Sequence, residues 1–296
     1  MNLRGKILPI TIGLMISGLF FSCTGEPETT DPEQGSDMSV EVEDNKSEVV
    51  YETKVEEVYK VSKESYFLDD GSANGYKEFS YDDRGNLTGI VNYRGSGDLL
   101  FEEKYELDEK GNILKAKLFD SEGLTSYTVY TYDDNGLLIG EEYYNHRDLY
   151  LSGSRFEYDK KNNKVLWESL DENKSLVLKA EYIYKGDDLI KVSFLTPLNK
   201  DDGSLDYSYR DDKVIKEVSI NGSGKEERRT EYEYDDDMMI VSKIFQLGRL
   251  SRVNEMEYDN MGQKVKMMTY NRSKKLISHT VYEYVTFQEE KTVPAE

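Results

Sequence analysis

Residues 230–235 read Thr-Glu-Tyr-Glu-Tyr-Asp. Tyr232 and Tyr234 alternate with acidic residues, which is the period-two pattern of a β-strand with one apolar and one solvated face. A two-residue stripe of this kind recurs every 24–26 residues, and its second residue is Tyr in eight copies and Leu107 in the ninth. The stripes are Phe79/Tyr81, Tyr105/Leu107, Tyr130/Tyr132, Phe156/Tyr158, Tyr182/Tyr184, Tyr207/Tyr209, Tyr232/Tyr234, Met256/Tyr258 and Tyr282/Tyr284.

Each stripe is followed by a turn and a second apolar run. The first turn reads Asp82-Asp83-Arg84-Gly85-Asn86. An Asp at the start of a turn can accept hydrogen bonds from its own backbone, and Gly or Asn supplies the positive φ that a hairpin requires. Runs such as residues 189–194, Leu-Ile-Lys-Val-Ser-Phe, follow the turn. Each repeat is therefore two antiparallel strands, and successive repeats form a meander.

The number of strands predicts strong curvature. About eighteen strands at roughly 4.8 Å each would make a flat sheet roughly 85 Å wide, and sheets of that width coil or close. The sequence thus predicts an all-β repeat domain over residues 49–288, with about nine two-strand units of about 25 residues. The units form a curved antiparallel meander with the aromatic stripe on the inner face, either as an open arc or barrel-like. Residues 289–296 are predicted to be a polar tail.

The first residues describe a secretory signal peptide. Arg4 and Lys6 precede the apolar residues 7–21, and a small residue stands before Cys23, the single cysteine of the chain. Residues 19–23, Leu-Phe-Phe-Ser-Cys, resemble the lipobox of bacterial lipoproteins, with Phe20 in the usual place of Leu. That resemblance implies cleavage after residue 22 and a diacylglyceryl group on Cys23. Fifteen helical residues would span only about 22 Å, short of the roughly 30 Å hydrocarbon core.

Composition indicates a tethered, hydrated body. Residues 23–48 are predicted to be a lipidated Cys and a disordered acidic tether, because Pro, Gly and acidic groups bury too little apolar surface to offset ordering entropy. The whole chain has a formal net charge of −21. This sign disfavours nucleic acid, whose phosphates need Lys and Arg clusters, and adsorption on anionic lipid. We expect a bacterial cell-envelope protein held by its lipid at the outer membrane, on its periplasmic or surface face.

The repeat resembles that of the YD-repeat proteins, whose units read roughly Tyr-x-Tyr-Asp-x-x-Gly-Asn-Leu. Residues 79–87, Phe-Ser-Tyr-Asp-Asp-Arg-Gly-Asn-Leu, match this pattern, as do residues 130–137, and the resemblance covers residues 76–284. Rhs shells of this family wind such strands into a container that ends in a self-cleaving Asp-Pro-x-Gly-Leu motif. That motif does not occur in this sequence. The resemblance implies an extracytoplasmic β-repeat scaffold, with an encapsulating shell as an alternative that requires a cavity large enough for cargo.

Catalytic and metal-binding patterns are weak, so we expect no enzyme activity, cofactor or metal. Asp82, Asp83 and Asn86 could offer oxygen ligands, but they lack the alternate spacing and closing Glu of an EF-hand loop, and turn chemistry explains them. His146 lies in a predicted turn and His279 in a predicted strand, without the partners of a triad or zinc set. Trp167 is expected to pack.

Two functions remain from these observations. The first is a lipid-anchored, non-catalytic envelope scaffold or protein-binding module whose partner is an unknown envelope protein. The alternative is a glycan-binding surface lipoprotein with a concave Tyr-rich face, because amphipathic rings can stack on sugars while their hydroxyls form hydrogen bonds. The same rings also stabilise sheets through cross-strand pairs. Candidate binding residues are Tyr81, Tyr130, Tyr132, Tyr158, Tyr182, Tyr184, Tyr207, Tyr209, Tyr232, Tyr234, Tyr258 and Tyr284.

Overall fold

The structure is a computed structural model that describes residues 51–294. The predicted signal peptide, Cys23 and the predicted tether lie outside this range. The described residues fold as one antiparallel sheet of 18 strands. Among them there is no helix of the length and apolarity that a membrane span requires.

The strands are short and regularly spaced, apart from the first and last. They are β1 (Tyr51–Leu68), β2 (Ala73–Tyr81), β3 (Leu87–Arg94), β4 (Leu99–Leu107), β5 (Ile113–Asp120), β6 (Gly123–Tyr132), β7 (Leu138–Asn145), β8 (Tyr150–Tyr158), β9 (Lys164–Leu170), β10 (Leu176–Lys185), β11 (Asp188–Leu195), β12 (Asp201–Arg210), β13 (Lys213–Asn221), β14 (Glu226–Asp235), β15 (Met238–Gln246), β16 (Arg249–Tyr258), β17 (Lys264–Asn271) and β18 (Leu276–Pro294).

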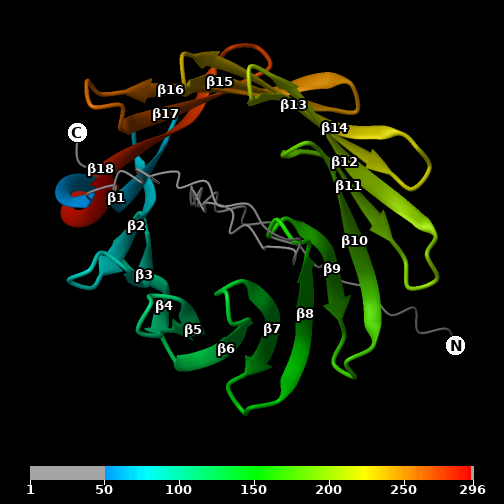
Figure 1. Ribbon diagram of the computed structural model, residues 1–296. Helices are drawn as coiled ribbons and strands as arrows, with labels where there is room; N and C mark the ends of the chain where they lie inside the picture. The colour runs from blue at the N-terminus through cyan, green and yellow to red at the C-terminus, as the bar shows by residue number, and fades with distance from the viewer. Residues whose placement is uncertain (1–50, 295–296) are drawn as a thin grey trace, which may run out of the picture. The chain divides into compact units, whose positions relative to one another are not determined.

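The sheet closes on itself. Each strand pairs antiparallel with the next along the chain, and β1 pairs with β18. Figure 1 shows the resulting ring, in which the blue first strand lies beside the red last strand. The predicted all-β meander of two-strand repeats is confirmed, and of its two predicted forms the structure has the closed, barrel-like one.

The seam of the ring is longer than the sequence predicted. Residues 51–61 of β1 pair only with residues 284–294 of β18, and a bulge after Val61 precedes the part of β1 that also pairs with β2. Residues 289–294, which belong to the predicted polar tail, continue β18. Ion pairs join the two strands of the seam: Lys291 contacts Glu56 at 2.6 Å and Lys60 contacts Glu289 at 3.1 Å.

The Asp-rich turns have the predicted chemistry. One carboxylate oxygen of Asp82 accepts hydrogen bonds from the backbone N–H groups of Arg84 and Asn86 at 3.0 and 2.8 Å. Its other oxygen accepts from the Asn86 amide at 3.0 Å, and Gly85 has a φ of +78°. The same bonds recur at the turns that begin at Asp108 and Asp159. These bonds, led by the Asn86 amide, lower the pKa of Asp82.

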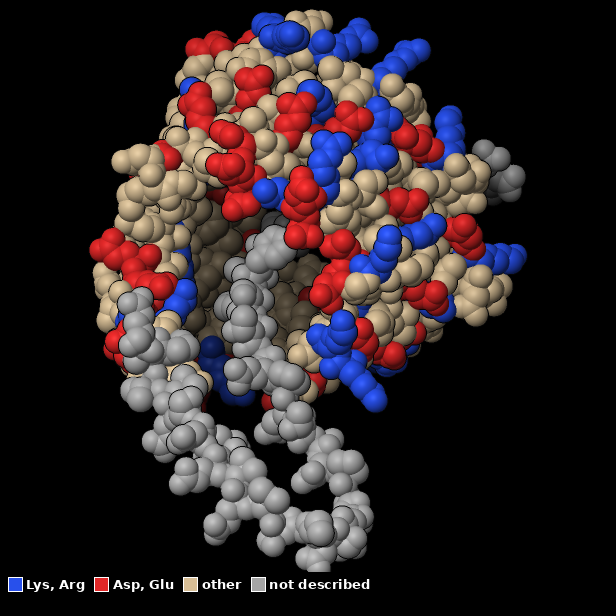
Figure 2. Space-filling model, turned by 45° about the horizontal axis from the view of Figure 1, so that its top comes forward, with Lys and Arg blue, Asp and Glu red and all other residues tan. Residues whose placement is uncertain are grey.

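The two faces of the sheet differ in polarity. In β14, Glu233 and Asp235 on one side are exposed, whereas Thr230 is 4% exposed. Figure 2 shows the charged side chains on the outer wall and a hollow lined mostly by uncharged residues. We call this hollow the lumen. Because the exposed acidic residues that alternate with the stripe belong to the charged outer face, we infer that the aromatic stripe faces the lumen. On the outer wall, ion pairs join Arg229 to Glu231 and Lys243 to Glu233.

The lumen is not filled by side chains. Only three apolar residues of the described strands are buried, namely Leu170, Ala180 and Val192. No large side chain of residues 51–294 is fully buried. Barrels of about 16–18 strands are wide enough to leave an aqueous channel, in contrast to small barrels whose side chains fill the centre. A filled interior would have excluded the alternative of an encapsulating shell. Because the lumen is not filled, the structure does not exclude it.

Candidate functional site

Eight tyrosines of the stripe share one structural role. Each hydroxyl donates a hydrogen bond of 2.7–3.0 Å to a backbone carbonyl of the preceding repeat, 19 or 20 residues earlier. The donor–acceptor pairs are Tyr81–Val61, Tyr132–Ile113, Tyr158–Leu138, Tyr184–Lys164, Tyr209–Leu189, Tyr234–Val214, Tyr258–Met239 and Tyr284–Lys264. We call these the carbonyl-bound tyrosines. Their hydroxyls join neighbouring repeats, so a ligand would meet them as part of the wall.

The other four candidate tyrosines occupy the first position of the stripe, as does Tyr282, which was not a candidate. We call Tyr130, Tyr182, Tyr207, Tyr232 and Tyr282 the lumen tyrosines; none donates to a backbone carbonyl of the preceding repeat. Burial raises the pKa of each one, to about 12 for Tyr130 and Tyr282. They are therefore protonated at neutral pH and keep an O–H donor.

Two lysines sit against these rings. The Lys164 ammonium lies 4.6 Å from the centre of the Phe156 ring and 5.8 Å from that of Tyr182. The Lys264 ammonium lies 4.3 Å from the centre of the Tyr282 ring. Burial lowers the pKa of both lysines, opposed by the charges of Glu141 and Glu64 respectively. Cation–π contacts of this kind stabilise an ammonium that has lost part of its water.

Two carboxylates on the lumen face have raised pKa values. For Glu141 the cause is burial, opposed by the charge of Lys164 and by hydrogen bonding to Ser154. For Glu217 it is again burial, opposed only by the charge of Arg228. Within residues 51–294, neither Glu141 nor Glu217 forms an ion pair at 4 Å or less. Carboxylates whose pKa is raised by burial are found more often at functional sites than elsewhere.

An aromatic cluster lies on the outer wall at β6–β8. The Tyr127 and Tyr144 rings stack with centres 5.0 Å apart, and Tyr150 meets Tyr144 edge-on at 5.7 Å. Lys174 lies 4.7 Å above the Tyr150 ring and contacts Glu142 at 2.7 Å. A cavity of about 270 Å³ adjoins this cluster, and the buried Tyr150 hydroxyl has no hydrogen-bond partner among the described residues.

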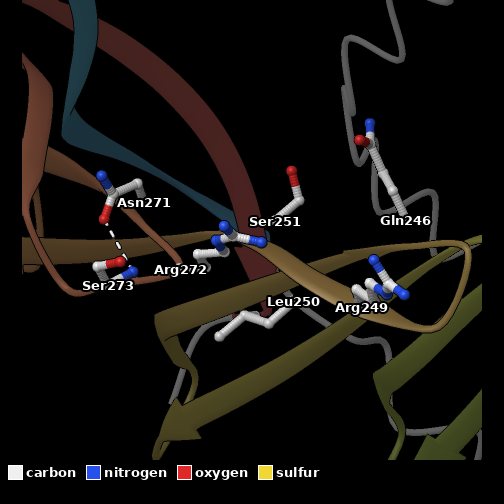
Figure 3. A pocket seen from close by; sticks show the side chains of 7 residues that line it. All are labelled: Gln246, Arg249, Leu250, Ser251, Asn271, Arg272 and Ser273. Atoms are coloured by element: carbon white, nitrogen blue, oxygen red, sulfur yellow. Dashed lines mark hydrogen bonds between the residues drawn. The ribbon is translucent and has the colours of Figure 1, made fainter.

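A second surface cavity of about 530 Å³ lies at one end of β15–β17. Figure 3 shows Arg249 and Arg272 among the residues that line it, and the Ser273 backbone N–H donates to the Asn271 side chain at 2.9 Å. The lining is polar, and its two guanidinium groups suit small anions. Gln246, Leu250 and Ser251 complete it.

The remaining sequence candidates take part in packing or turns. The His279 ring stacks on Phe67 with centres 4.8 Å apart. Trp167 lies between Phe156 and Ala180 in the strand register, and Ala180 is 0% exposed. His146 lies in the turn between β7 and β8. Across residues 51–294, no three His, Cys, Asp or Glu side chains are arranged to hold a metal ion.

Sequence reasoning included four of the five lumen tyrosines as binding candidates, but missed Tyr282, Glu141 and Glu217 in that role. A signal for the carboxylates existed. Glu217 lies in the apolar run of residues 214–218, and it is directly opposite Tyr207 of the stripe. Because the side chains of directly opposite residues share one face of a sheet, an acidic residue opposite a stripe residue must face the lumen.

Comparison with known proteins gives distant likenesses among solved structures. No protein-family model matches the chain. No curated protein matches it in sequence. Among solved structures, a porin-like protein from Bacteroides uniformis is similar over 76% of this chain and 98% of its own, with 10% identity and a TM-score of 0.42. A porin-like protein from Bacteroides vulgatus covers the same shares with 11% identity and a TM-score of 0.26.

The Tc holotoxin pore of Photorhabdus luminescens is similar over 69% of this chain, with 13% identity and a TM-score of 0.34. This chain spans only 12% of that toxin chain. At such identities and TM-scores these likenesses say nothing about what this chain binds.

Proposed function

We propose that the chain is a non-catalytic scaffold or protein-binding module of the bacterial cell envelope, attached by lipid on Cys23. The observation that carries this proposal is the set of eight tyrosine hydroxyl bonds that join successive repeats of a closed ring. Such a ring holds its surface in a fixed shape, and fixed surfaces bind partners with less loss of conformational entropy. The outer wall offers charges of both signs for electrostatic complementarity.

The lipid attachment is tested by Cys23→Ser in the producing bacterium. The variant should leave the membrane fraction while the purified protein keeps its melting temperature, because residue 23 precedes the first strand, which begins at Tyr51. A variant that stays in the membrane fraction contradicts lipid anchoring.

The binding role is tested by crosslinking the intact protein in envelopes and then titrating the purified crosslinked candidate. A protein partner that binds saturably, and loses affinity when outer-wall charges such as Lys243 are reversed, supports the proposal. A partner that binds equally well after every outer-wall reversal contradicts the assignment to that surface.

A second candidate, glycan binding in the lumen, is favoured by a specific observation. The hydroxyls of Tyr182, Tyr207 and Tyr282 bond to no other residue among residues 51–294 and lie on the face of an unfilled ring. Aromatic rings with available hydroxyls suit sugars, which offer both apolar C–H faces and hydroxyl groups. Titration of the protein with neutral oligosaccharides tests this candidate, and lack of binding to any of them counts against it.

A further inference from the structure

The lumen face of β12, β13 and β14 brings an unpaired carboxylate between two tyrosines. In the strand register Glu217 on β13 lies opposite Tyr207 on β12 and opposite Thr230 on β14. Tyr232 lies two residues beyond Thr230 and therefore on the same face. The charge of Glu217 also contributes to the raised pKa of both tyrosines, after burial.

Two polar groups at this place have unused hydrogen-bonding capacity. Glu217 has no hydrogen bond or ion pair with any other residue from 51 to 294, although burial raises its pKa. Thr230 is 4% exposed, and its Oγ1 forms no hydrogen bond of ordinary geometry within the same residues, although the neighbouring Tyr232 hydroxyl is close enough for contact with Thr230 to lower the pKa of Tyr232. Partly buried polar groups without partners are costly, and proteins keep few of them. A ligand in the lumen would supply the missing partners.

The available groups define the chemistry of that ligand. The carboxylate accepts hydrogen bonds, the tyrosine hydroxyls and Arg228 donate them, and the tyrosine rings offer flat apolar surfaces. A sugar ring with several hydroxyl groups suits all three kinds of group. Its adjacent hydroxyls can donate to one carboxylate and accept from Tyr or Arg, and its C–H face can pack on a tyrosine ring. We propose that Glu217, Tyr207, Tyr232 and Thr230 form a carbohydrate-binding subsite in the lumen. The proposal rests on the glycan-binding candidate and specifies where in the lumen, and through which groups, it acts.

A second carboxylate occupies the equivalent register position in another repeat. Glu141 on β7 lies opposite Tyr130 on β6 and Ser154 on β8, as Glu217 lies opposite Tyr207 and Thr230. The two glutamates occupy equivalent positions in the repeat. An extended chain of sugars in the lumen would therefore find two carboxylate-centred subsites, whereas a single sugar would use one.

The test is isothermal titration of the otherwise full-length Cys23→Ser protein with chitohexaose, cellohexaose and maltohexaose as neutral probes. Glu217→Gln should weaken the binding of at least one probe about tenfold, because the amide keeps the shape but loses the charged acceptor. Its melting temperature should not fall, since the neutral amide removes a partly buried charge. The matched control is Glu233→Gln on the outer face of the neighbouring strand β14, which should change affinity less than about twofold.

The outcomes separate the subsite from the function on which it rests. If the parent protein binds none of the three sugars, both the glycan candidate and the subsite are overturned. If it binds a sugar and Glu217→Gln binds it equally well, the subsite alone is overturned. A parallel titration with Ca²⁺ that shows Glu217-dependent cation binding, without sugar binding, would also overturn the carbohydrate assignment.

Discussion

The bond from Tyr184 to the preceding repeat can be tested by removing a single oxygen atom. The Tyr184 hydroxyl donates to the Lys164 carbonyl at 3.0 Å, and the ring is half-buried in the wall. Tyr184→Phe keeps the ring and loses that bond, whose net contribution is about 0.5–1.5 kcal/mol. Lumen water can replace part of the bond, so we expect a loss of about 1 kcal/mol and a melting temperature lower by about 2–4 °C for a domain of this size.

The assay is thermal unfolding followed by circular dichroism, repeated in urea to obtain the free energy of unfolding. Tyr184→Ala should lose about 3 kcal/mol, because the ring contacts disappear as well. Tyr143→Phe is the control, since Tyr143 is 38% exposed and its hydroxyl bonds to no other described residue. If Tyr184→Phe and Tyr143→Phe are equally stable, the carbonyl-bound hydroxyl does not join the repeats and our interpretation is refuted.

Three further predictions follow from the repeat and its charges. Leu107→Tyr should stabilise the domain by about 0.5–1.5 kcal/mol in urea unfolding, because it gives the one stripe without this tyrosine its own hydroxyl donor; a loss of stability would contradict equivalence of the repeats. Gly111→Ala should cost more stability than Gly136→Ala, since both residues have positive φ but only at Gly111 would the new Cβ lie 2.5 Å from an Asn86 oxygen; equal costs would refute this. Burial raises the pKa of Glu141 and Glu217 above the ordinary 4.5. Between pH 4.5 and the raised pKa values the folded state binds more protons than the unfolded state, so the free energy of unfolding should rise as the pH falls through this range. Below pH 3.8 the free energy of unfolding should fall, because Asp82, Asp108 and Asp159, whose pKa values are lowered by turn hydrogen bonds, become protonated. In a pH series of melting temperatures, the double variant Glu141→Gln/Glu217→Gln should lose the rise and keep the fall.

Much of the fold follows from the sequence because the repeat is local. The alternation at Tyr232 and Tyr234 fixes which side chains share a face, and the Asp82–Asn86 turn has its own hydrogen-bond pattern. Strands, turns and their order were therefore predictable. The second tyrosine of the stripe could also be singled out by its spacing, but not its acceptor, since that carbonyl lies in the preceding repeat.

Closure and its seam were not predictable from local pattern. Residues 289–294 are mostly polar and form a strand because β1 provides a partner more than 200 residues away, with contacts such as Lys291 to Glu56. The inner candidate site depends on the same closure. Glu217 is chemically ordinary in the sequence, and its carboxylate becomes enclosed only when the ring curves its strand toward the lumen.

The pairing of β1 with β18 is the feature on which the closed ring depends, and disulfide trapping tests it directly. In a Cys23→Ser background, cysteines replace Glu57 and Gln288, which are partners in the register and are both exposed. A control places the second cysteine at Glu290, two residues out of register. The closed ring predicts rapid intramolecular oxidation of the 57/288 pair, much faster than that of the 57/290 pair, with the melting temperature retained. An open arc predicts slow oxidation of both pairs or crosslinks between molecules, and that result would contradict the closed barrel.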